Sequence, residues 1–560
     1  MANDTKKLAQ EYAAWEEKQE AYKKDHPERR KQYKLDIGHE VKALYTPLDL
    51  EERGFEYSKD LGFPGQAPNV RGITPLMNRG DNLIYSVYSG FGTAEDSKER
   101  YEKIISWGAT KLNMAWDLPS QIGYDSDHIM STGEIGRTGV AIDSLKDLEI
   151  LFADMKLSDI GAVASLCNSI GPIGVALFAA LGKKQGLDPK DFTVYLQNDP
   201  LKEYAARGTY IFPIEPAVKL ACDAVEWTIK YAPTWGSMQF CGNHFNAAGA
   251  GSHNACAFAM SDGFVYMDEL VKRGYKPEEI VPHCRMFVDE REDFFVAAAL
   301  GRAARKVWGE QMESRYGVDH DSTAKQIKMT SYGHGGETLT EPISNVMRIG
   351  FAALGYYLGG IQFMSNAGYD EAMGLAQETT CKVSLRTSEI INNELGFSKV
   401  IDPLAGSYYV ESLTMDIADD IRKEIDNIQK NYGDSKAAIS AGYFQGVISR
   451  GAVRRQAEFE SLERQFVSVN IHKTDEELPR GAFKIDPTVE TRQLARLKEV
   501  RETRDNEKVQ ACLAEIRRVT EANENVVDAV IDALLNYATI GEICAIWRDI
   551  YGEFRSLTTF

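Results

Sequence analysis

The sequence predicts an α/β protein, a (β/α)8 TIM barrel with an N-terminal helical arm and a C-terminal helical extension. Three observations support this fold class. Eight short apolar runs alternate with longer helical stretches between about residues 84 and 395. The first 35 or so residues have a charged, helical composition, and charged helical segments follow residue 414. Eight strand–helix pairs fit a closed barrel, and a doubly wound open sheet is the alternative.

The N-terminal segment, residues 1–65, is expected to form an arm rather than a domain. Its first part places Trp15 and Tyr22 among many charged residues. This composition is typical of a helix that contacts a partner or a second copy of the chain. The charges also exclude a secretory signal, whose central region must be apolar.

The barrel is expected over residues 66–400, with one strand in each apolar run. The runs are IYSVYSGF (84–91), TKLNMAWDL (110–118), DIGAVASLC (159–167), FTVYLQND (192–199), GSMQFCG (236–242), IVPHCRMF (280–287), QIKMTSYG (326–333) and GIQFMSN (360–366). Several runs end in polar or glycine-flanked residues, such as Gln197 and His244. A barrel places its active site at the carboxyl ends of its strands, so we expect the site in the loops that follow them.

Helical stretches follow every run. They are residues 94–108, 143–155, 171–184, 215–232, 254–274, 291–313, 341–360 and 370–394. Residues 401–560 then carry charged helices with no further strand pattern. We expect these to form a helical extension, not a second catalytic unit.

Composition excludes several classes of function. The chain has 560 residues, 43% of them apolar, and 83 acidic against 64 basic side chains give a net charge of −19. This charge repels nucleic acid and anionic membranes, and no run of about 18 apolar residues could span a bilayer. The eight cysteines lack the spacing of a zinc site. We expect a cytoplasmic enzyme without a metal site of its own.

Seven strings resemble the large chain of the methylmalonyl-CoA mutase family, which includes isobutyryl- and 2-hydroxyisobutyryl-CoA mutases. They are YSGFGTAEDSKERY (88–101), WDLPSQIGYDSD (116–127), GRTGVAIDSLKDLEILF (136–152), LQNDPLKEYAARGTYIFP (196–213), GNHFNAAGAGS (242–252), VIDPLAGSYYVESLT (400–414) and TIGEICAIWRDIYGEFR (539–555). QND-LKEY followed by R-TYI-P is the most specific of them. Together the strings span the chain from about residue 60 onward.

The resemblance implies adenosylcobalamin as cofactor. Members that hold cobalamin themselves carry a flavodoxin-like domain whose DxHxxG loop supplies a histidine to the cobalt. DHPERR (25–30) lacks both that spacing and the glycine. The resemblance therefore implies a separate small cobalamin-binding subunit, which supplies the cobalt ligand, and an α2β2 heterotetramer.

His244 is the first predicted catalytic residue. It follows a predicted strand in GNH, in a loop where an imidazole faces a ligand, and a loop histidine bonded to backbone groups is the structural alternative. In the resembled family the matching histidine hydrogen-bonds the thioester carbonyl as the carbonyl-CoA group migrates. His253, nine positions on, has no third residue with which to form a metal site.

The resemblance assigns two more residues to catalysis. Tyr88 matches a tyrosine that lies between the substrate and the adenosyl side of the cofactor, although an aromatic residue in an apolar run usually belongs to a core. Gln197 matches a glutamine that contacts the substrate. Its string QND is polar at a position where a buried strand is apolar.

Arg207 occupies the position at which the family divides between carboxylated and plain acyl groups. A guanidinium recognises a carboxylate through two parallel hydrogen bonds, whereas most arginines form surface ion pairs. Asn243 replaces a tyrosine before His244, which predicts an acyl group bulkier than methyl. Arg285 and Phe287 are the other predicted substrate contacts. Predicted cofactor contacts are Arg207, Asn366, Glu371, Trp116 and Leu118.

Other positions depart from the family pattern. Asp81 and Ser86 stand where family arginines contact the CoA phosphates, and His283 and Arg285 alter a loop that contributes to CoA binding. The loop YGHGGE (332–337) is longer than usual. These changes indicate an unusual acyl group or a displaced CoA.

The resemblance predicts a radical mutase whose substrate threads the barrel, most closely one for methylmalonyl-CoA or a larger alkylmalonyl-CoA. The alternatives are an isobutyryl- or 2-hydroxyisobutyryl-CoA mutase, a non-catalytic scaffold subunit of a mutase, and a non-radical lyase or isomerase that uses His244 as a base. A scaffold has no reason to retain His244, Tyr88 and Gln197 together.

Overall fold

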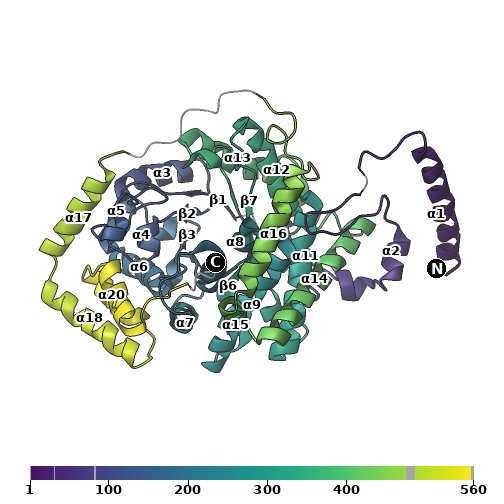
Figure 1. Ribbon diagram of the computed structural model, residues 1–560. Coiled ribbons are helices and arrows are strands. Elements are labelled where there is room, and N and C mark those ends of the chain that lie inside the picture. The colour runs from purple at the N-terminus through teal and green to yellow at the C-terminus, as the bar shows by residue number, and fades with distance from the viewer. Residues whose placement is uncertain (1, 31, 81–83, 475–485, 557–560) are drawn as a thin grey trace.

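The structure is a computed structural model that describes residues 2–30, 32–80, 84–474 and 486–556. Its centre is a sheet of eight parallel strands in the order β4-β3-β2-β1-β8-β7-β6-β5 (Figure 1). The strands are β1 Ile84–Ser89, β2 Leu112–Met114, β3 Val163–Leu166, β4 Val194–Gln197, β5 Met238–Cys241, β6 Cys284–Phe287, β7 Lys328–Gly333 and β8 Phe363–Asn366. A parallel bridge between Tyr195 and Gly236 joins β4 to the start of β5, so the sheet forms a nearly closed barrel.

Helices surround this barrel (Figure 1). Those between the strands and after β8 are α3 Ala94–Ser106, α4 Leu118–Gln121, α5 Leu145–Leu151, α6 Gly171–Lys184, α7 Ile214–Tyr231, α8 Gly242–Ala248, α9 Ser252–Lys272, α10 Pro277–Ile280, α11 Phe294–Tyr316, α12 Asn345–Leu358 and α13 Glu378–Asn393. The remaining helices are α1 Ala2–Lys23, α2 Pro47–Glu52, α14 Tyr408–Tyr432, α15 Ser435–Ser440, α16 Tyr443–Glu460, α17 Val489–Thr503, α18 Asn506–Glu521, α19 Val527–Leu535 and α20 Ile540–Tyr551. The predicted (β/α)8 barrel is confirmed, and the open sheet is excluded.

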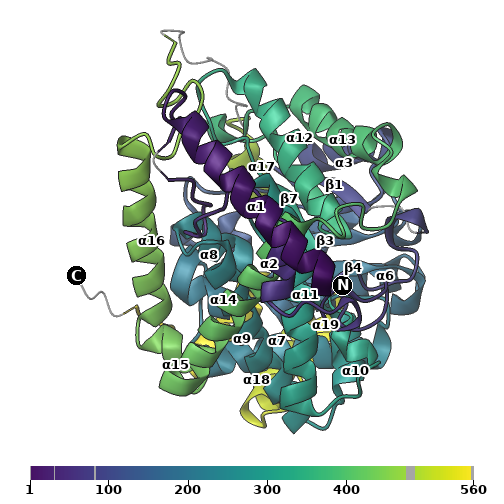
Figure 2. The same cartoon turned by 90° about the vertical axis from the view of Figure 1, so that its right-hand side faces the viewer.

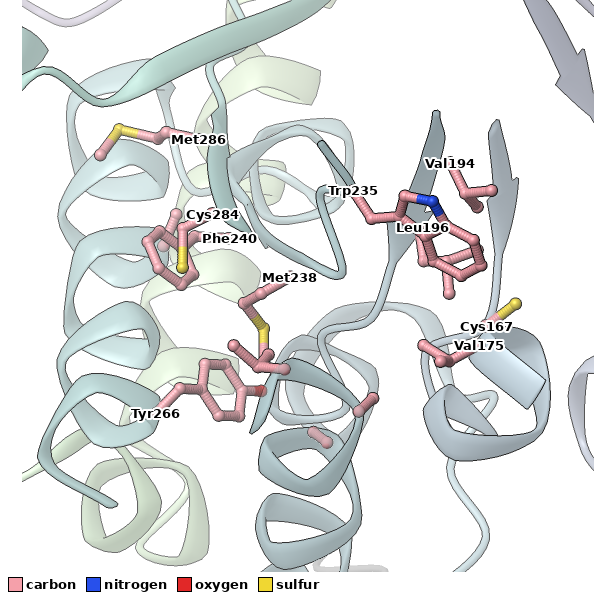
Figure 3. Close-up of a cluster of buried hydrophobic side chains, with 14 of the residues drawn as sticks. Cys167, Val175, Val194, Leu196, Trp235, Met238, Phe240, Tyr266, Cys284 and Met286 are labelled. Carbon is pink, nitrogen blue, oxygen red and sulfur yellow. The ribbon is translucent and has the colours of Figure 1, made fainter. Parts of the chain in front are cut away.

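Successive side chains of a strand point alternately toward the surrounding helices and into the barrel interior. Val194, Leu196, Met238, Phe240 and the other outward side chains of β4 to β6 lie in an apolar layer with Trp235 and Tyr266 (Figure 3). The residues between them point inward, as expected from the two-residue period of a strand. This alternation explains why polar and charged residues occur inside otherwise apolar runs. It places them on the wall of the barrel's interior.

The helix α3 shows how local sequence fixes one element. Its N-terminus is a capping box, in which Thr93 and Asp96 exchange hydrogen bonds with each other's backbone N–H groups. Ser97, Tyr101 and Ile104 then recur at helical spacing and face the barrel as buried residues. Thr93 thus sets where the chain turns from the loop after β1 into the helix.

The C-terminal helices pack along the outside of the barrel. The helix α14 lies against α9 and α11 (Figure 1), and α19 lies against α6. The buried Arg302 of α11 holds the start of α14, because its guanidinium contacts Asp402 and donates to Glu411 at 2.7 Å. The predicted C-terminal helical extension is confirmed.

The N-terminal helix α1 projects from the side of the body in Figure 1 and faces the viewer in Figure 2. It contacts α2, and most of its described side chains are exposed. This confirms the predicted helical arm. The division at residues 65 and 400 stays a prediction. None of the helices in the described part of the chain combines the length and the apolar composition that crossing a membrane requires.

Candidate active site

A cavity of about 290 Å³ lies inside the barrel toward the carboxyl ends of its strands. It gathers most of the predicted site residues on one surface. These are Tyr88, Gln197, Arg207, Asn243, His244, Arg285, Phe287 and Glu371. They come from positions more than 280 residues apart in the sequence, and the barrel brings them together because each follows or belongs to a strand. Such a cavity with convergent polar groups is the usual form of a small-molecule site.

His244 lies in the first turn of α8, not in a loop as its sequence context suggested. The helix begins at Gly242, directly after β5, and this turns the imidazole toward the cavity. Its Nδ1 is buried and has no hydrogen-bond partner among the described residues. Burial holds the pKa of His244 well below its usual value, and the nearby cations Lys202, Arg207, Arg291 and His334 lower it further. The imidazole is therefore neutral near pH 7.

The Gln197 side chain at the end of β4 has a defined orientation. Its Oε1 accepts hydrogen bonds from Lys202 Nζ at 3.1 Å and from Asn168 Nδ2 at 3.1 Å. With the oxygen held by two donors, the amide nitrogen is the end left to interact with a ligand in the cavity. Lys202 thus acts on the site through Gln197.

The Arg207 side chain is fixed by a neighbouring carboxylate. It lies at the end of a short π-helix, Glu203–Arg207, and its Nη1 donates to Glu203 Oε1 at 3.3 Å and Thr209 Oγ1 at 3.0 Å. Glu203 is fully buried and also pairs with Lys202 at 2.5 Å. One buried ion pair, Lys202–Glu203, therefore positions both Gln197 and Arg207.

We expect Lys202→Met to lower the free energy of unfolding by about 3 kcal/mol, because removing one partner of a buried pair leaves the other charge poorly compensated. Urea denaturation followed by circular dichroism measures this loss. Lys42→Met, which breaks an exposed pair with Asp49, is the matched control and is expected to cause no resolvable change. Equal stabilities of Lys202→Met and the parent protein would contradict the assigned role of the pair.

Tyr88, on β1, is half-buried in the wall of the cavity. Burial raises its pKa to about 12; the positive charge of Arg207 opposes this rise, and the negative charge of Glu371 adds to it. The phenol is therefore neutral at physiological pH. Arg207 and Glu371 line the same cavity as Tyr88.

The structure places some of the predicted cofactor contacts at the cavity and others away from it. Glu371 is exposed at the rim of the cavity, where its Oε2 accepts a hydrogen bond from Tyr332 at 3.0 Å. Asn366 points out of the barrel, because its Nδ2 donates to Ser384 O and Ser388 Oγ of α13. Asn366 is thus absent from the lining of this cavity.

Trp116 and Leu118 also lie outside the cavity. Trp116 is fully buried and stacks on Phe178, with ring centroids 6.5 Å apart. Leu118 is half-buried at the first turn of α4. Contacts of Asn366, Trp116 and Leu118 with a cofactor stay predictions.

Two residues that depart from the family pattern occupy closed positions. Ser86 is buried inside β1, and His283 is buried with its Nδ1 2.8 Å from the carbonyl oxygen of Trp235. Asp81 lies outside the described residues. Neither Ser86 nor His283 offers an exposed group to a phosphate.

A charged cluster beside His244 was not predicted from the sequence. His334 contacts Asp289 and lies 3.1 Å from Glu337, and Arg291 Nε lies 3.2 Å from Asp289. Burial opposes the charged imidazolium, but Asp289 outweighs it and raises the pKa of His334 to about 9. His334 is therefore a cation near pH 7. The long loop YGHGGE, which contains His334, was the one signal of it in the sequence.

Further cavity residues missed by sequence reasoning are inward-facing side chains within strands or just before them. They include Lys111, Asn113, Tyr195 and Gln239, together with Tyr332 at the rim. The sequence of such short runs does not show which side chains point into the barrel. The structure shows that these residues do.

Comparison with known proteins identifies the family. The family model described as methylmalonyl-CoA mutase matches residues 34–553. The large subunit of 2-hydroxyisobutanoyl-CoA mutase from Aquincola tertiaricarbonis is 34% identical and covers 96% of each chain. Methylmalonyl-CoA mutase from Rhizobium meliloti is 34% identical over 93% of this chain and 72% of its own length, and human mitochondrial methylmalonyl-CoA mutase is 32% identical over 93% and 68%. The chain therefore belongs to the methylmalonyl-CoA mutase family.

Proposed function

We propose that this chain is the large subunit of an adenosylcobalamin-dependent mutase that moves the carbonyl-CoA group of an acyl-CoA to the neighbouring carbon. The observation that carries the proposal is the meeting of His244, Tyr88, Gln197 and Arg207 in one cavity of a mutase-family barrel. When bound, adenosylcobalamin supplies the carbon radical that takes a hydrogen atom from the substrate. The enzyme is an intramolecular transferase.

The rim of the cavity fits the adenosyl group in part. The exposed Glu371 carboxylate has acceptor capacity for ribose hydroxyls, and Arg207 and Tyr88 line the same cavity. Asn366 does not fit this role in the described conformation, because its amide is bound to α13. We therefore assign adenosyl contacts to Glu371, Tyr88 and Arg207.

The cavity's own side chains stabilise the migrating group. His244, being neutral, donates an N–H to the thioester carbonyl oxygen, which gains negative charge as the group moves. The Gln197 amide donates to the same region of the substrate. The Tyr88 ring separates the reacting carbons from the rim and excludes water.

A carboxylated acyl group is the substrate class that Arg207 favours. With Nη1 bound to Glu203 and Thr209, the rest of the guanidinium can pair with a carboxylate. Asn243, shorter than the tyrosine of the family pattern, leaves room for a group larger than methyl. We propose an ethylmalonyl- or larger alkylmalonyl-CoA.

A second candidate is 2-hydroxyisobutyryl-CoA, with isobutyryl-CoA beside it. It is supported by the relative from Aquincola tertiaricarbonis, which matches over nearly the whole of both chains. The charge of Arg207 is also partly neutralised by Glu203, which lessens its demand for a substrate carboxylate. A scaffold role is disfavoured, because a scaffold does not require a cavity with an ordered catalytic set.

We further propose a cytoplasmic α2β2 heterotetramer with a small cobalamin-binding subunit that supplies the histidine ligand of cobalt. The name of that relative, a large subunit, supports the two-chain arrangement. The exposed arm α1 is available to contact a partner or a second copy.

A substrate panel tests the proposed acyl group. With the small subunit and adenosylcobalamin present, we expect kcat/KM for ethylmalonyl-CoA to exceed that for isobutyryl-CoA and 2-hydroxyisobutyryl-CoA by at least about tenfold. Product formation followed by liquid chromatography measures it. A preference for either uncarboxylated thioester over methylmalonyl-, ethylmalonyl- and propylmalonyl-CoA would refute the carboxylate assignment and leave family membership intact.

A further inference from the structure

Aromatic side chains from opposite strands meet at the inner end of the cavity. In the closed ring β4 and β8 are separated by three strands on either side. Tyr195 of β4 and Phe363 of β8 nevertheless contact each other edge to face, with ring centroids 5.3 Å apart. This contact therefore spans the whole width of the barrel.

Arg285 packs against both rings of this layer. Its guanidinium carbon lies 3.0 Å from the centroid of the Tyr195 ring and 3.8 Å from that of Phe363. Arg285 comes from β6, midway between β4 and β8 on one side of the ring. The three side chains close the axis of the barrel in the described conformation. The sequence suggested a substrate that threads the barrel. Such a substrate requires this layer to open.

Some cations that line the cavity have an acidic partner and others do not. Arg207 pairs with Glu203, and Arg291 and His334 both pair with Asp289 and Glu337. Lys111 and Arg285 have no acidic partner among the residues that the structure describes. Both side chains line the cavity, and Lys111 and Arg285 are 5% and 6% exposed.

Burying two cations without a carboxylate is unfavourable unless a ligand compensates them. Arg285 Nε is buried and has no hydrogen-bond partner within the described chain. Burial lowers the pKa of Lys111 to about 7, and the field of Arg285 adds to that effect. Burial likewise lowers the pKa of Arg285 to about 10. One bound anion would compensate the two buried positive charges.

We propose that Lys111 and Arg285 form an anion-binding site at the inner end of the cavity, which takes one carboxylate or phosphate group of the ligand. The inference rests on the proposed function, because it assigns the anion to the acyl-CoA. Tyr195 is two residues from Gln197 on β4, which places this site about 7 Å along the strand from the Gln197 amide. It is a second anion site, separate from Arg207.

Isothermal titration of the full chain tests the site without cobalamin or turnover. The probes are free ethylmalonate, CoA and uncharged pantetheine. We expect Lys111→Met and Arg285→Met each to raise the Kd of at least one anionic probe by about tenfold or more, and to leave pantetheine within about twofold. Weakening of ethylmalonate alone identifies the acyl carboxylate as the occupant, in which case Lys111 and Arg285 bind it in place of Arg207, and weakening of CoA alone identifies a phosphate. Lys111→Arg and Arg285→Lys keep the charge and are expected to retain binding within about threefold.

Lys183→Met is the matched control, because Lys183 is an exposed cation near the end of α6 and does not line the cavity. Its removal changes the net charge equally, and we expect less than a twofold effect. Unchanged affinities in folded Lys111→Met and Arg285→Met, an equal loss in Lys183→Met, or no binding of either anion by the parent chain at millimolar concentration would overturn the site. If the methionine variants do not fold, Lys111→Gln and Arg285→Gln replace them. An inactive mutase with intact anion binding would refute the proposed function and not this site.

Discussion

Replacing His244 by alanine is expected to lower turnover by roughly two to four decades while leaving the KM for the acyl-CoA within about tenfold. The carbonyl oxygen gains negative charge mainly in the transition state of migration, so its hydrogen bond to His244 is strongest there. The alanine substitution removes this hydrogen bond and leaves the other contacts of the substrate in place. Steady-state kinetics of the reconstituted enzyme gives both constants.

The pH dependence of the parent enzyme provides a second test of His244. Its pKa lies well below 6.5, because burial disfavours the charged imidazolium and the fields of four cations lower the pKa further. The neutral form is therefore kept as the pH falls from 8 to 7, and we expect no loss of turnover from His244 in that interval. His253→Ala is the control for His244→Ala, because His253 is a half-buried histidine of α9 outside the cavity lining. Equal turnover numbers for His244→Ala and the parent would remove His244 from the mechanism.

Replacing Arg207 by glutamine is expected to lower kcat/KM for ethylmalonyl-CoA at least about a hundredfold while sparing isobutyryl-CoA. Losing one partner of a desolvated charge pair costs about 3 to 5 kcal/mol, and glutamine cannot supply the charge or the two parallel donors. An uncarboxylated substrate has no such pair to lose. The ratio of the two specificity constants in one preparation measures the effect.

The two substrates serve as internal controls for this variant. A fall for both would indicate damage to the site, since Arg207 also pairs with the buried Glu203. Thermal denaturation separates this case by reporting any loss of stability. Equal specificity ratios for parent and variant would show that Arg207 does not read a carboxylate.

The strands could be predicted from the sequence because each lies within one apolar run. The run FTVYLQND contains β4, for example, and GIQFMSN contains β8. The helix α8 could not be predicted, because GNHFNAA has no apolar periodicity and begins with glycine. Phe245 in this helix packs against Phe258 of α9 and Phe444 of α16, and these contacts come from other elements of the fold.

Site residues that lie in family motifs could be predicted from the sequence. Residues whose place depends on which side of a strand they face could not. His244, Gln197 and Arg207 occur in strings specific to the family, and the structure places all three in one cavity. Asn366 occurs in a similar string but faces α13, because consecutive strand residues point to opposite sides. Lys111 and Arg285 lie in apolar runs, and which face they occupy depends on the register of the barrel.

Activity of the purified components tests the central claim most directly. The chain is assayed with ethylmalonyl-CoA alone, then with adenosylcobalamin, and then with adenosylcobalamin and a cobalamin-binding subunit of roughly 130 to 150 residues, the size of one small domain. We predict isomerised product in the third mixture only, and no cobalamin absorbance with the isolated chain after gel filtration. Isomerisation without cobalamin, as expected of a lyase or isomerase that uses His244 as a base, or stoichiometric retention of cobalamin by the chain alone, would contradict the account.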